Sequence, residues 1–509
     1  MIMRKTLLAA LLFAAAIPAA AQPPGTSNLA ARIEQIGPSL DRLFVRYREE
    51  QHVPGLAFGI VADGHLAYVQ TLGSRTLDQN EIVTPDSLFR IASMSKAFTA
   101  LAILKLRDEG RLRLDALAEE YVPELRGWHY PTSDSPRIRV RDLLSHAGGF
   151  VTDDPWGDRQ TPLAEAEFTA MLRAGVPFTR APQTAFEYSN LGYALLGRIV
   201  TNVSGRPFED YIQAEIMRPL GMNDTGYDVA RVRRDRFASG WRWENDAFAR
   251  EPDMARGAFG AMGGVITSAR DYARWAAFLL SAWPPRDGPE TGPVRRSSVR
   301  ELAQGLNFVA VSRRPGDPNN CPQAAAYGMG FRVAQDCDLG LTLGHGGGYP
   351  GYGSYLLLLP ERGVAIFAFA NRTYAGPSPP VWAAAVELNH AGLLAGRSIP
   401  VSGALAGAYR VSAAMWQAGS LDPGRGALAM NFLMDRTADN WAREFARLKA
   451  QAGNCRTDSP IEANGALAGR FQWACERGTL QGQLLLAPTN PPTIQALRFN
   501  LVTPTSTPR

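Results

Sequence analysis

The chain has 509 residues, of which 46% are apolar and 20% are charged. This is the composition of a globular protein, so it excludes a disordered, collagenous or coiled-coil chain, and the length allows two or three domains. The formal net charge is +5 and no run of five or six like charges occurs, so we expect no nucleic-acid partner. Only four of the 53 basic residues are lysines: Lys5, Lys96, Lys105 and Lys449.

Residues 1–21 have the features of a secretory signal peptide. Arg4 and Lys5 form a positive start, Leu7–Ile17 form an apolar stretch, and small residues up to Ala21 offer a cleavage site. The apolar run is too short to span a bilayer, which needs about 20 residues. We therefore expect an exported protein, periplasmic or secreted after cleavage near Ala21, without a stable membrane anchor. Cleavage removes two basic residues and lowers the net charge from +5 to +3.

Two predicted β-hairpins lie on either side of a long segment with mostly helical patterns. Leu56–Ala62 and His65–Leu72 are separated by Asp63-Gly64, a strong hairpin signal, and Ser354–Leu359 and Val364–Ala370 form a second pair. This arrangement predicts an α+β fold, in which an antiparallel sheet built from both ends is flanked by helices and joined to a mostly helical lobe. The helices expected between the hairpins are Ser93–Glu109, Leu191–Val203, Glu209–Met217 and Ala269–Leu280.

The C-terminal part of the chain has a different pattern. A glycine-rich stretch at 392–407 is followed by helix-like and then strand-like segments. We expect a main domain at residues 22–395 and a small α+β domain of about 100 residues at 405–509, whose role the sequence does not indicate. Its expected elements are helices at Ala408–Gln417 and Asn440–Ala452 and strands near 467–475, 479–487 and 493–502.

The four cysteines form two local pairs, Cys321 with Cys337 and Cys455 with Cys475. In an exported chain an even number of cysteines indicates disulfides, and pairing between neighbours is the simplest of the three connectivities. The cysteines have neither CxxC spacing nor a partnering histidine cluster. We therefore expect structural disulfides and no metal site.

A serine and a lysine lie one helical turn apart at the start of the first predicted helix. Ser93 and Lys96 share a helix face at the spacing i, i+3. A serine hydroxyl becomes a good nucleophile only when a neighbour takes its proton, which a lysine with a lowered pKa can do and an arginine cannot. In a chain with so few lysines, Lys96 is a candidate base for Ser93. The same spacing also occurs by chance in solvent-facing first turns.

Two later segments add groups suited to the same chemistry. Tyr188 and Asn190 precede a helix, where a phenol can shuttle a proton and an amide can hold a substrate carbonyl. A packed tyrosine with an asparagine N-cap is the structural alternative. The segment 344–348, Gly-His-Gly-Gly-Gly, follows a short β-like run, and its N–H groups can form half of an oxyanion hole. A tight glycine turn is the alternative there.

In this order, the three segments resemble the serine β-lactamase/penicillin-binding-protein superfamily. The match is closest to its class C-like branch, with D-alanyl-D-alanine carboxypeptidases, D-aminopeptidases and related esterases. The resemblance covers roughly residues 30–390 and implies a β-lactamase/transpeptidase-like fold. Flanking segments that also resemble this branch are 53–57, 89–96, 143–149, 263–271 and 327–331.

The resemblance implies roles for the matching residues. Ser93 matches the nucleophile that accepts the acyl group, and Lys96 matches its paired amine. Tyr188 matches the tyrosine that exchanges protons with nucleophile and leaving group, and Asn190 matches the amide that orients the substrate. Whether Lys96 or Tyr188 takes the first proton stays open, because the two form one coupled network.

The third motif implies the rest of the site. His345 and Gly347 match substrate-binding positions, and the backbone N–H groups of Ser93 and Gly348 match the oxyanion hole. The familiar β-lactamases have a lysine where this chain has His345. A histidine with an ordinary pKa near 6.5 is only partly charged at neutral pH, so this difference favours peptidase, amidase or esterase activity over β-lactamase activity.

These residues predict an exported serine hydrolase that acts on an amide, peptide or ester through an acyl-enzyme at Ser93, of the D-Ala-D-Ala carboxypeptidase, D-amino-acid amidase or esterase type. The alternatives are a β-lactamase and a slow-turnover protein that binds penicillin or peptidoglycan peptides. We expect a small-molecule or peptide substrate, with cell-wall peptides as one candidate, and no cofactor.

Three other kinds of site are not supported, because the residues around each motif do not match the required pattern. Gly346–Gly351 matches the dinucleotide-binding pattern, but a strand rather than a helix is expected after it. The glycines after His345 are similar to a lipase oxyanion loop, but the chain has no G-x-S-x-G elbow. The six histidines include no H-x-x-x-H pair that would indicate a metal site.

Overall fold

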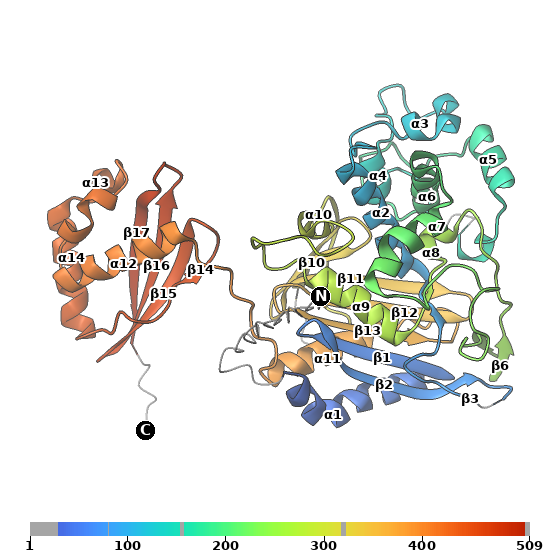
Figure 1. The fold of residues 1–509 in the computed structure, drawn as a ribbon, viewed down its shortest axis with the longest axis horizontal. Helices are drawn as coiled ribbons and strands as arrows, with labels where there is room; N and C mark the ends of the chain where they lie inside the picture. Colours follow the sequence, from blue (N-terminus) through green and yellow to red (C-terminus); the bar gives the residue numbers. More distant parts are fainter. Residues whose placement is uncertain (1–28, 80, 153–156, 317–321, 504–509) are drawn as a thin grey trace, which may run out of the picture.

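The computed structural model describes residues 29–79, 81–152, 157–316 and 322–503. The predicted signal peptide at residues 1–21 and the cysteine at 321 lie outside these ranges. Within them, no helix combines the length and apolar character that crossing a membrane requires. Figure 1 shows a large part built around a nine-stranded sheet and a smaller C-terminal part with a four-stranded sheet of its own.

The large sheet is antiparallel and is assembled from both ends of this part of the chain, as predicted. The first strand of the N-terminal hairpin pairs with the last strand of the C-terminal one, so that Leu56 lies opposite Ala370 in the interior of the sheet. In spatial order the strands are β3 (Glu81–Ile82), β2 (His65–Thr76), β1 (Gly55–Ala62), β13 (Val364–Ala370), β12 (Tyr352–Leu359), β11 (Gly340–Tyr349), β10 (Arg332–Asp336), β9 (Pro322–Tyr327) and β8 (Asn307–Arg313).

Helices cover both faces of this sheet, and the side chains of β1 alternate between them. Phe58 and Ile60 join the cluster formed with α1 (Leu29–Glu50) and α11 (Ser378–His390), where Phe44 stacks on Phe58 with ring centroids 3.7 Å apart. The residues of β1 that alternate with these point to the other face of the sheet. There they join a second hydrophobic cluster, which extends into the helical lobe. Because both faces are covered, β1 and β13 are continuous apolar runs rather than alternating ones.

The helical lobe is an insertion between the two hairpins, and the four predicted helices are confirmed within it. The segment 209–217 continues from α-helical into π-helical geometry. The elements between β3 and β8 are β4 (Phe89–Arg90), η1 (Ala92–Ser95), α2 (Lys96–Asp108), α3 (Ala118–Tyr121), η2 (Pro123–Gly127), α4 (Val140–Leu144), η3 (Asp158–Gln160), α5 (Glu165–Ala174), α6 (Asn190–Ser204), α7 (Phe208–Ile212), η4 (Gln213–Met217), η5 (Arg218–Leu220), β5 (Trp241–Glu244), β6 (Ala247–Arg250), α8 (Gly260–Gly263), β7 (Ile266–Thr267), α9 (Ala269–Leu280) and α10 (Arg296–Glu301).

Strands β8 to β10 extend the sheet through a segment where the sequence predicted mostly helices. They lie at one edge of the sheet, and β8 has no fully buried residue. An edge strand has one partner and a solvated face, so its sequence lacks the apolar run that marks a central strand. The expectation of a mostly helical segment was therefore wrong for this region.

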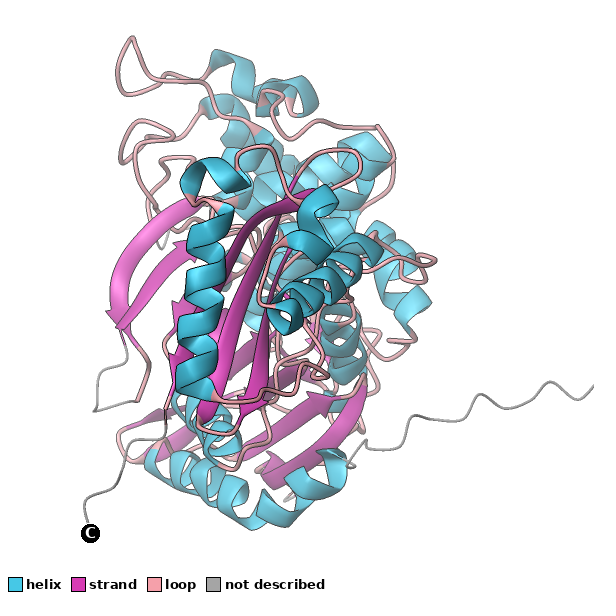
Figure 2. Ribbon diagram, turned by 90° about the vertical axis from the view of Figure 1, so that its left-hand side faces the viewer, coloured by secondary structure: helices cyan, strands magenta, loops and turns pink. Residues whose placement is uncertain are grey.

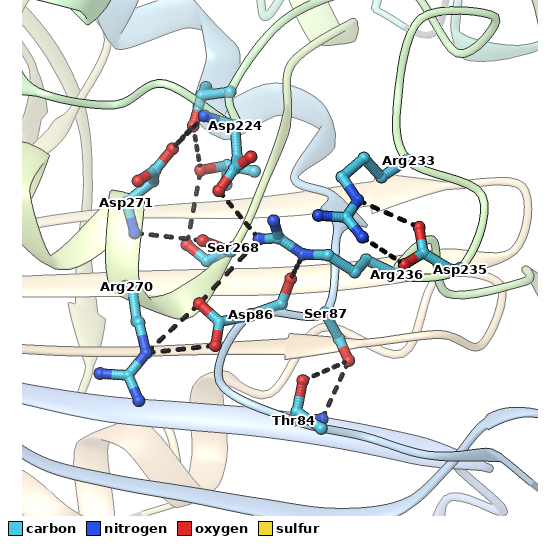
Figure 3. Close-up of polar contacts among 12 residues, drawn as sticks. Thr84, Asp86, Ser87, Asp224, Arg233, Asp235, Arg236, Ser268, Arg270 and Asp271 are labelled. Carbon is cyan, nitrogen blue, oxygen red and sulfur yellow. Dashed lines mark hydrogen bonds and ion pairs between the residues drawn. The ribbon is translucent and has the colours of Figure 1, made fainter.

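A network of charged side chains holds the segment that leads into η1 (Figure 3). Arg236 donates to the backbone oxygen of Asp86 at 2.8 Å and pairs with Asp224 at 3.0 Å. Arg270 at the start of α9 pairs with the Asp86 carboxylate at 3.3 Å. The backbone N–H of Asp224 donates to Asp271, which is also in the first turn of α9. Through Arg270, these contacts hold Asp86 against the start of α9.

The C-terminal part consists of a four-stranded antiparallel sheet with helices across one face (Figure 2). The three predicted strands and both predicted helices are confirmed. Trp416, Phe445 and Trp473 lie in a hydrophobic cluster that shares no residue with the two clusters of the large part. Its elements are α12 (Gly403–Ala418), η6 (Asp422–Ala427), α13 (Phe432–Asp435), α14 (Ala438–Ala452), β14 (Glu462–Ala463), β15 (Ala468–Cys475), β16 (Gly478–Ala487) and β17 (Thr493–Val502).

The cysteines follow the expected pattern as far as the structure describes them. Cys455 and Cys475 form a disulfide that ties the segment just after α14 to the end of β15. Cys337 is also disulfide-bonded. The division into domains at 22–395 and 405–509 stays a prediction.

Candidate active site

Ser93 lies in the short turn η1, between β4 and α2, and this turn is held from several sides. Ser354 on β12 donates its hydroxyl to the carbonyl oxygen of Ile91 at 2.8 Å, and the N–H of Ile91 donates to Val265 at 3.0 Å. Ala92 has a φ of +48°, a left-handed conformation that a residue with a Cβ atom rarely adopts. Such backbone strain persists only where the surrounding structure imposes it, and it is common beside reactive groups.

The side chain of Lys96 is fully buried and reaches three oxygen atoms. Its Nζ lies 3.0 Å from Ser93 Oγ, 2.9 Å from Asn190 Oδ1 and 3.0 Å from the carbonyl oxygen of Met262. The same Nζ lies 4.8 Å from the centre of the Tyr188 ring. The structure therefore brings together the predicted residues Ser93, Lys96, Tyr188 and Asn190, with Met262 of α8 beside them.

The identity of these three oxygens limits what Lys96 can do. The amide oxygen of Asn190 and the carbonyl oxygen of Met262 can only accept hydrogen bonds, so Lys96 must donate to both. The hydroxyl of Ser93 can either accept or donate. A protonated Lys96 would donate to all three oxygens, whereas a neutral Lys96 would donate to two and direct its lone pair at the Ser93 hydroxyl. The second arrangement is the one in which Lys96 can take the serine proton.

Tyr188 and Asn190 come from the start of α6, where the N-cap is Ser189. The Ser189 hydroxyl accepts from the N–H of Gly192 at 3.1 Å, so the alternative of an asparagine N-cap is wrong. The N–H of Ser189 donates to His146 Nδ1 at 3.1 Å, and the His146 ring packs against Tyr188 with centroids 4.3 Å apart. His146 thus supports the turn from which Tyr188 and Asn190 extend. Since Asn190 Oδ1 contacts Lys96, its Nδ2 is the atom that could donate to a substrate.

The glycines at 346–348 belong to strand β11 rather than to a tight turn. The pairing of β10 with β11 ends at Arg332 and Gly344, so the described strands leave the rest of β11 unpaired along that edge. A Cβ atom on Gly347 would lie 2.3 Å from the Ile91 carbonyl oxygen, which places β11 directly against the turn that carries Ser93. Alternate N–H groups along such an edge point outward. The predicted N–H donor of Gly348 lies on this strand.

His345 lies at the site, but the expectation that it is partly charged at neutral pH was wrong. Its Nδ1 lies 2.7 Å from the carbonyl oxygen of Gly346 and must donate to it, so Nε2 accepts from the Tyr327 hydroxyl at 2.9 Å. Burial, together with the charge of Lys96, lowers the pKa of His345 to about 3. The ring is therefore neutral above that pH and cannot act as the cation that holds a substrate carboxylate.

Arg332 offers a cation beside His345. It is exposed on β10 opposite Gly344, and its guanidinium lies 5.9 Å from the centre of the Phe186 ring. It lies close enough that its charge lowers the pKa of both His345 and His146 further. Arg332 was not identified from the sequence, because one exposed arginine among so many carries no signal of its own.

Two other residues of the site were also not predicted from the sequence. His146 and Tyr327 fall within the flanking segments 143–149 and 327–331 that resemble the superfamily, although the resemblance of these segments implies no role for either residue. Both are buried and pack against each other with ring centroids 4.4 Å apart. Their location within those segments is the sequence feature that could have indicated a role at the site.

The described residues contain one cluster that could in principle hold a metal ion, formed by Asp336, Cys337 and Asp338. Cys337 is disulfide-bonded, and Arg314 pairs with Asp336 at 2.6 Å and with Asp338 at 2.7 Å. These groups are already engaged, so the cluster does not fit a metal ion.

We expect Gly347→Ala to abolish the reaction at Ser93. The new methyl group would meet the Ile91 carbonyl oxygen and the Ser354 hydroxyl, at 2.3 and 2.2 Å, and would push β11 away from the nucleophile. The matched control is Gly346→Ala, whose Cβ has only ordinary contacts, the nearest at 3.4 Å. Turnover of an activated ester measures the effect, and equal activity of the two variants would contradict this placement of β11.

We also expect acid to destabilise the protein through its buried histidines. Burial lowers the pKa of His345 to about 3 and holds the pKa of His146 well below its usual value. Between about pH 6.5 and 3 the unfolded chain therefore binds protons at these positions that the folded chain does not, so stability falls as pH falls.

Denaturant unfolding at pH 6.5 and 4.5 measures this loss. The difference between the two pH values should be smaller in His345→Gln than in the wild type, whatever the absolute stability of the variant. An equal difference in both proteins would show that His345 is not held neutral by the fold.

Solved structures share this architecture. The octameric penicillin-binding protein homologue from Pyrococcus abyssi matches with a TM-score of 0.58 at 23% identity, over 89% of this chain and 91% of that one. A class C beta-lactamase matches with a TM-score of 0.56 at 19% identity, over 70% of this chain and 96% of that one. At these identities the matches establish the α+β β-lactamase/transpeptidase-like fold.

Sequence relatives and a family model agree with the fold. Protein flp of Staphylococcus aureus (strain COL) is 28% identical over 338 residues, which span 65% of this chain and 62% of flp. The unguisins hydrolase ungD' of Aspergillus campestris is 27% identical over 358 residues, or 68% of this chain and 64% of that protein. The chain thus matches less than two thirds of the length of these relatives. The Beta-lactamase family model matches residues 40–390, and the chain belongs to this family.

Proposed function

We propose that this protein is an exported serine hydrolase that forms an acyl-enzyme at Ser93 with an amide, peptide or ester substrate. The observation that carries the proposal is a set of contacts made by Lys96 Nζ, which lies 3.0 Å from Ser93 Oγ, 2.9 Å from Asn190 Oδ1 and 3.0 Å from the carbonyl oxygen of Met262. A serine beside a buried, oriented amine is an arrangement for nucleophilic catalysis. The relative named as a hydrolase of unguisins supports hydrolysis as the reaction class.

The proposed reaction has two steps. Ser93 Oγ attacks the substrate carbonyl carbon while its proton passes to Lys96 or Tyr188, and the N–H groups of Ser93 and Gly348 stabilise the oxyanion. The bond to the leaving group then breaks, and Tyr188 protonates that group with the serine proton, which it received directly or by way of Lys96. In the second step water attacks the ester at Ser93, releases the acid and restores the serine hydroxyl.

The surroundings of His345 favour substrates that carry a carboxylate. His345 is neutral, so it presents no charge to the substrate. Arg332 stands exposed on the neighbouring strand and has a planar guanidinium suited to a carboxylate. This supports the peptidase or amidase type over a simple esterase. A β-lactam also carries a carboxylate, so a β-lactamase and a slow-turnover binding protein remain the alternatives to test.

Export is part of the proposal. It rests on the signal-like segment at residues 1–21 and on the disulfide between Cys455 and Cys475, because such bonds persist in oxidising compartments. A small molecule or peptide is the substrate class that the family implies.

Intact-mass spectrometry with an activated ester and with a β-lactam tests the nucleophile and its base. The wild type should gain the mass of one acyl group, transiently if it is a hydrolase and persistently if it is a binding protein. We expect no adduct with Ser93→Ala. Lys96→Arg should lose at least about 100-fold in acylation rate, because the charge remains while the base is lost.

Lys105→Arg on the same helix α2 is the matched control, since its ion pair with Glu109 is also available to arginine. It should acylate like the wild type. An adduct on Ser93→Ala, or full activity of Lys96→Arg, would overturn the assignment of nucleophile or base.

We expect Arg332→Gln to weaken binding of carboxylate-bearing substrates. Loss of one charged hydrogen-bonding partner should raise KM by about 10- to 100-fold. The same substrate with its carboxylate converted to a methyl ester is the control, and its KM should not change. If both KM values rise together, Arg332 does not select for the carboxylate.

A further inference from the structure

Tyr374, just after β13, has an unusual conformation and an unusual position. Its φ is +56°, in the left-handed region, and its side chain remains 51% exposed. Its backbone N–H donates to the carbonyl oxygen of Tyr352 at 3.1 Å, which holds it at the end of the β11–β12 hairpin. A tyrosine in this conformation is strained, so neighbouring contacts must maintain it.

The ring of Tyr374 lies over Gly348, the glycine whose N–H is the proposed oxyanion donor. A Cβ atom on Gly348 would lie 2.9 Å from Cδ1 of this ring. Gly347 and Gly348 direct their missing side chains to opposite faces of β11, because side chains alternate along a strand. Gly347 therefore faces the turn that carries Ser93, and Gly348 faces Tyr374.

The hydroxyl of Tyr374 is tied to the helical lobe. It donates to Asp158 Oδ2 at 2.6 Å, and Asp158 is held in η3 by the buried Thr161, whose hydroxyl donates to the Asp158 carbonyl oxygen at 2.7 Å. Burial and the neighbouring carboxylate raise the pKa of Tyr374 to about 12, so the phenol stays protonated and able to donate at neutral pH. One side chain thus links the sheet to the helical lobe beside the site.

The order of the side chains beside β11 determines in which direction a bound substrate runs along this strand. Arg332 lies opposite Gly344 at one end, and Tyr374 lies over Gly348 at the other. His345 and Gly348 are three residues apart, or about 10 Å along a strand. A substrate with its leaving-group carboxylate near Arg332 and its carbonyl near Gly348 must therefore extend its acyl group toward Tyr374.

We propose that Tyr374 is a specificity-determining residue, which limits the size of the acyl group because its hydrogen bond to Asp158 keeps its ring across the end of the site. The inference rests on the proposed function, since it presupposes an acyl-enzyme at Ser93. Small acyl groups fit beneath the ring. Larger ones must displace it and break the bond to Asp158.

Hydrolysis of p-nitrophenyl acetate, butyrate and octanoate tests this, because the leaving group is constant and only the acyl group grows. The main variant is Tyr374→Gly, since glycine adopts a positive φ without strain and the fold should tolerate it. We expect the octanoate-to-acetate ratio of kcat/KM to rise about tenfold or more over the wild type.

Two further variants remove the tether while leaving a ring in place. Tyr374→Phe and Asp158→Ala each delete the hydrogen bond, and both should raise the same ratio by a smaller factor than Tyr374→Gly. Because the two changes lie on different elements, one remains informative if the other fails to fold, which thermal melting shows.

The outcomes separate this inference from the proposed function. If the wild type forms an adduct at Ser93 and Tyr374→Gly leaves the ratio unchanged, the inference is overturned and the proposed function stands. If the wild type forms no adduct and releases no p-nitrophenol, the proposed function fails and this inference fails with it. A ratio that rises in Tyr374→Gly and also in both tether variants supports it.

Discussion

The contacts of Lys96 Nζ unite three distant parts of the chain. Ser93 comes from the turn after β4, Asn190 from the start of α6, and Met262 from α8, and all three oxygens lie within 3.0 Å of one nitrogen. The amine is fully buried, so each of these contacts replaces a hydrogen bond to water. The orientation of Lys96, and with it the chemistry available to Ser93, depends on the helical lobe being docked on the sheet.

The buried rings behind this amine form a neutral wall. His146 and His345 are both held uncharged, the first packed against Tyr188 and the second bonded to Tyr327. A second cation next to the buried Lys96 would itself be costly to bury. Because the imidazoles are neutral, Lys96 is the amine beside Ser93. The positive charge that a substrate can contact is then that of the exposed Arg332.

Much of this could be predicted from the sequence, where the signal was local. The hairpin at Asp63-Gly64 and the strand 493–502 have clear patterns, and Ser93 and Lys96 share one helix face by spacing alone. Edge strands such as β8 lack an apolar run and were missed. The charge state of His345 depends on burial and on a hydrogen bond from Tyr327, which are tertiary properties that no spacing encodes. The proposed roles of Arg332 and Tyr374 depend on which residues the fold places beside them, so they could not be predicted from the sequence.

The pairing of β1 with β13 limits the stage of synthesis and folding at which the active site can assemble. Ser93 and Lys96 are synthesised early, but the turn that holds them leans on β12, and β12 is held in turn by β13. These contacts cannot form until β12 and β13, more than 250 residues after Ser93, have been synthesised. A nascent or translocating chain therefore carries its nucleophile and amine in an unassembled state. If the chain is exported as proposed, its reactivity is confined to the compartment in which it completes its sheet.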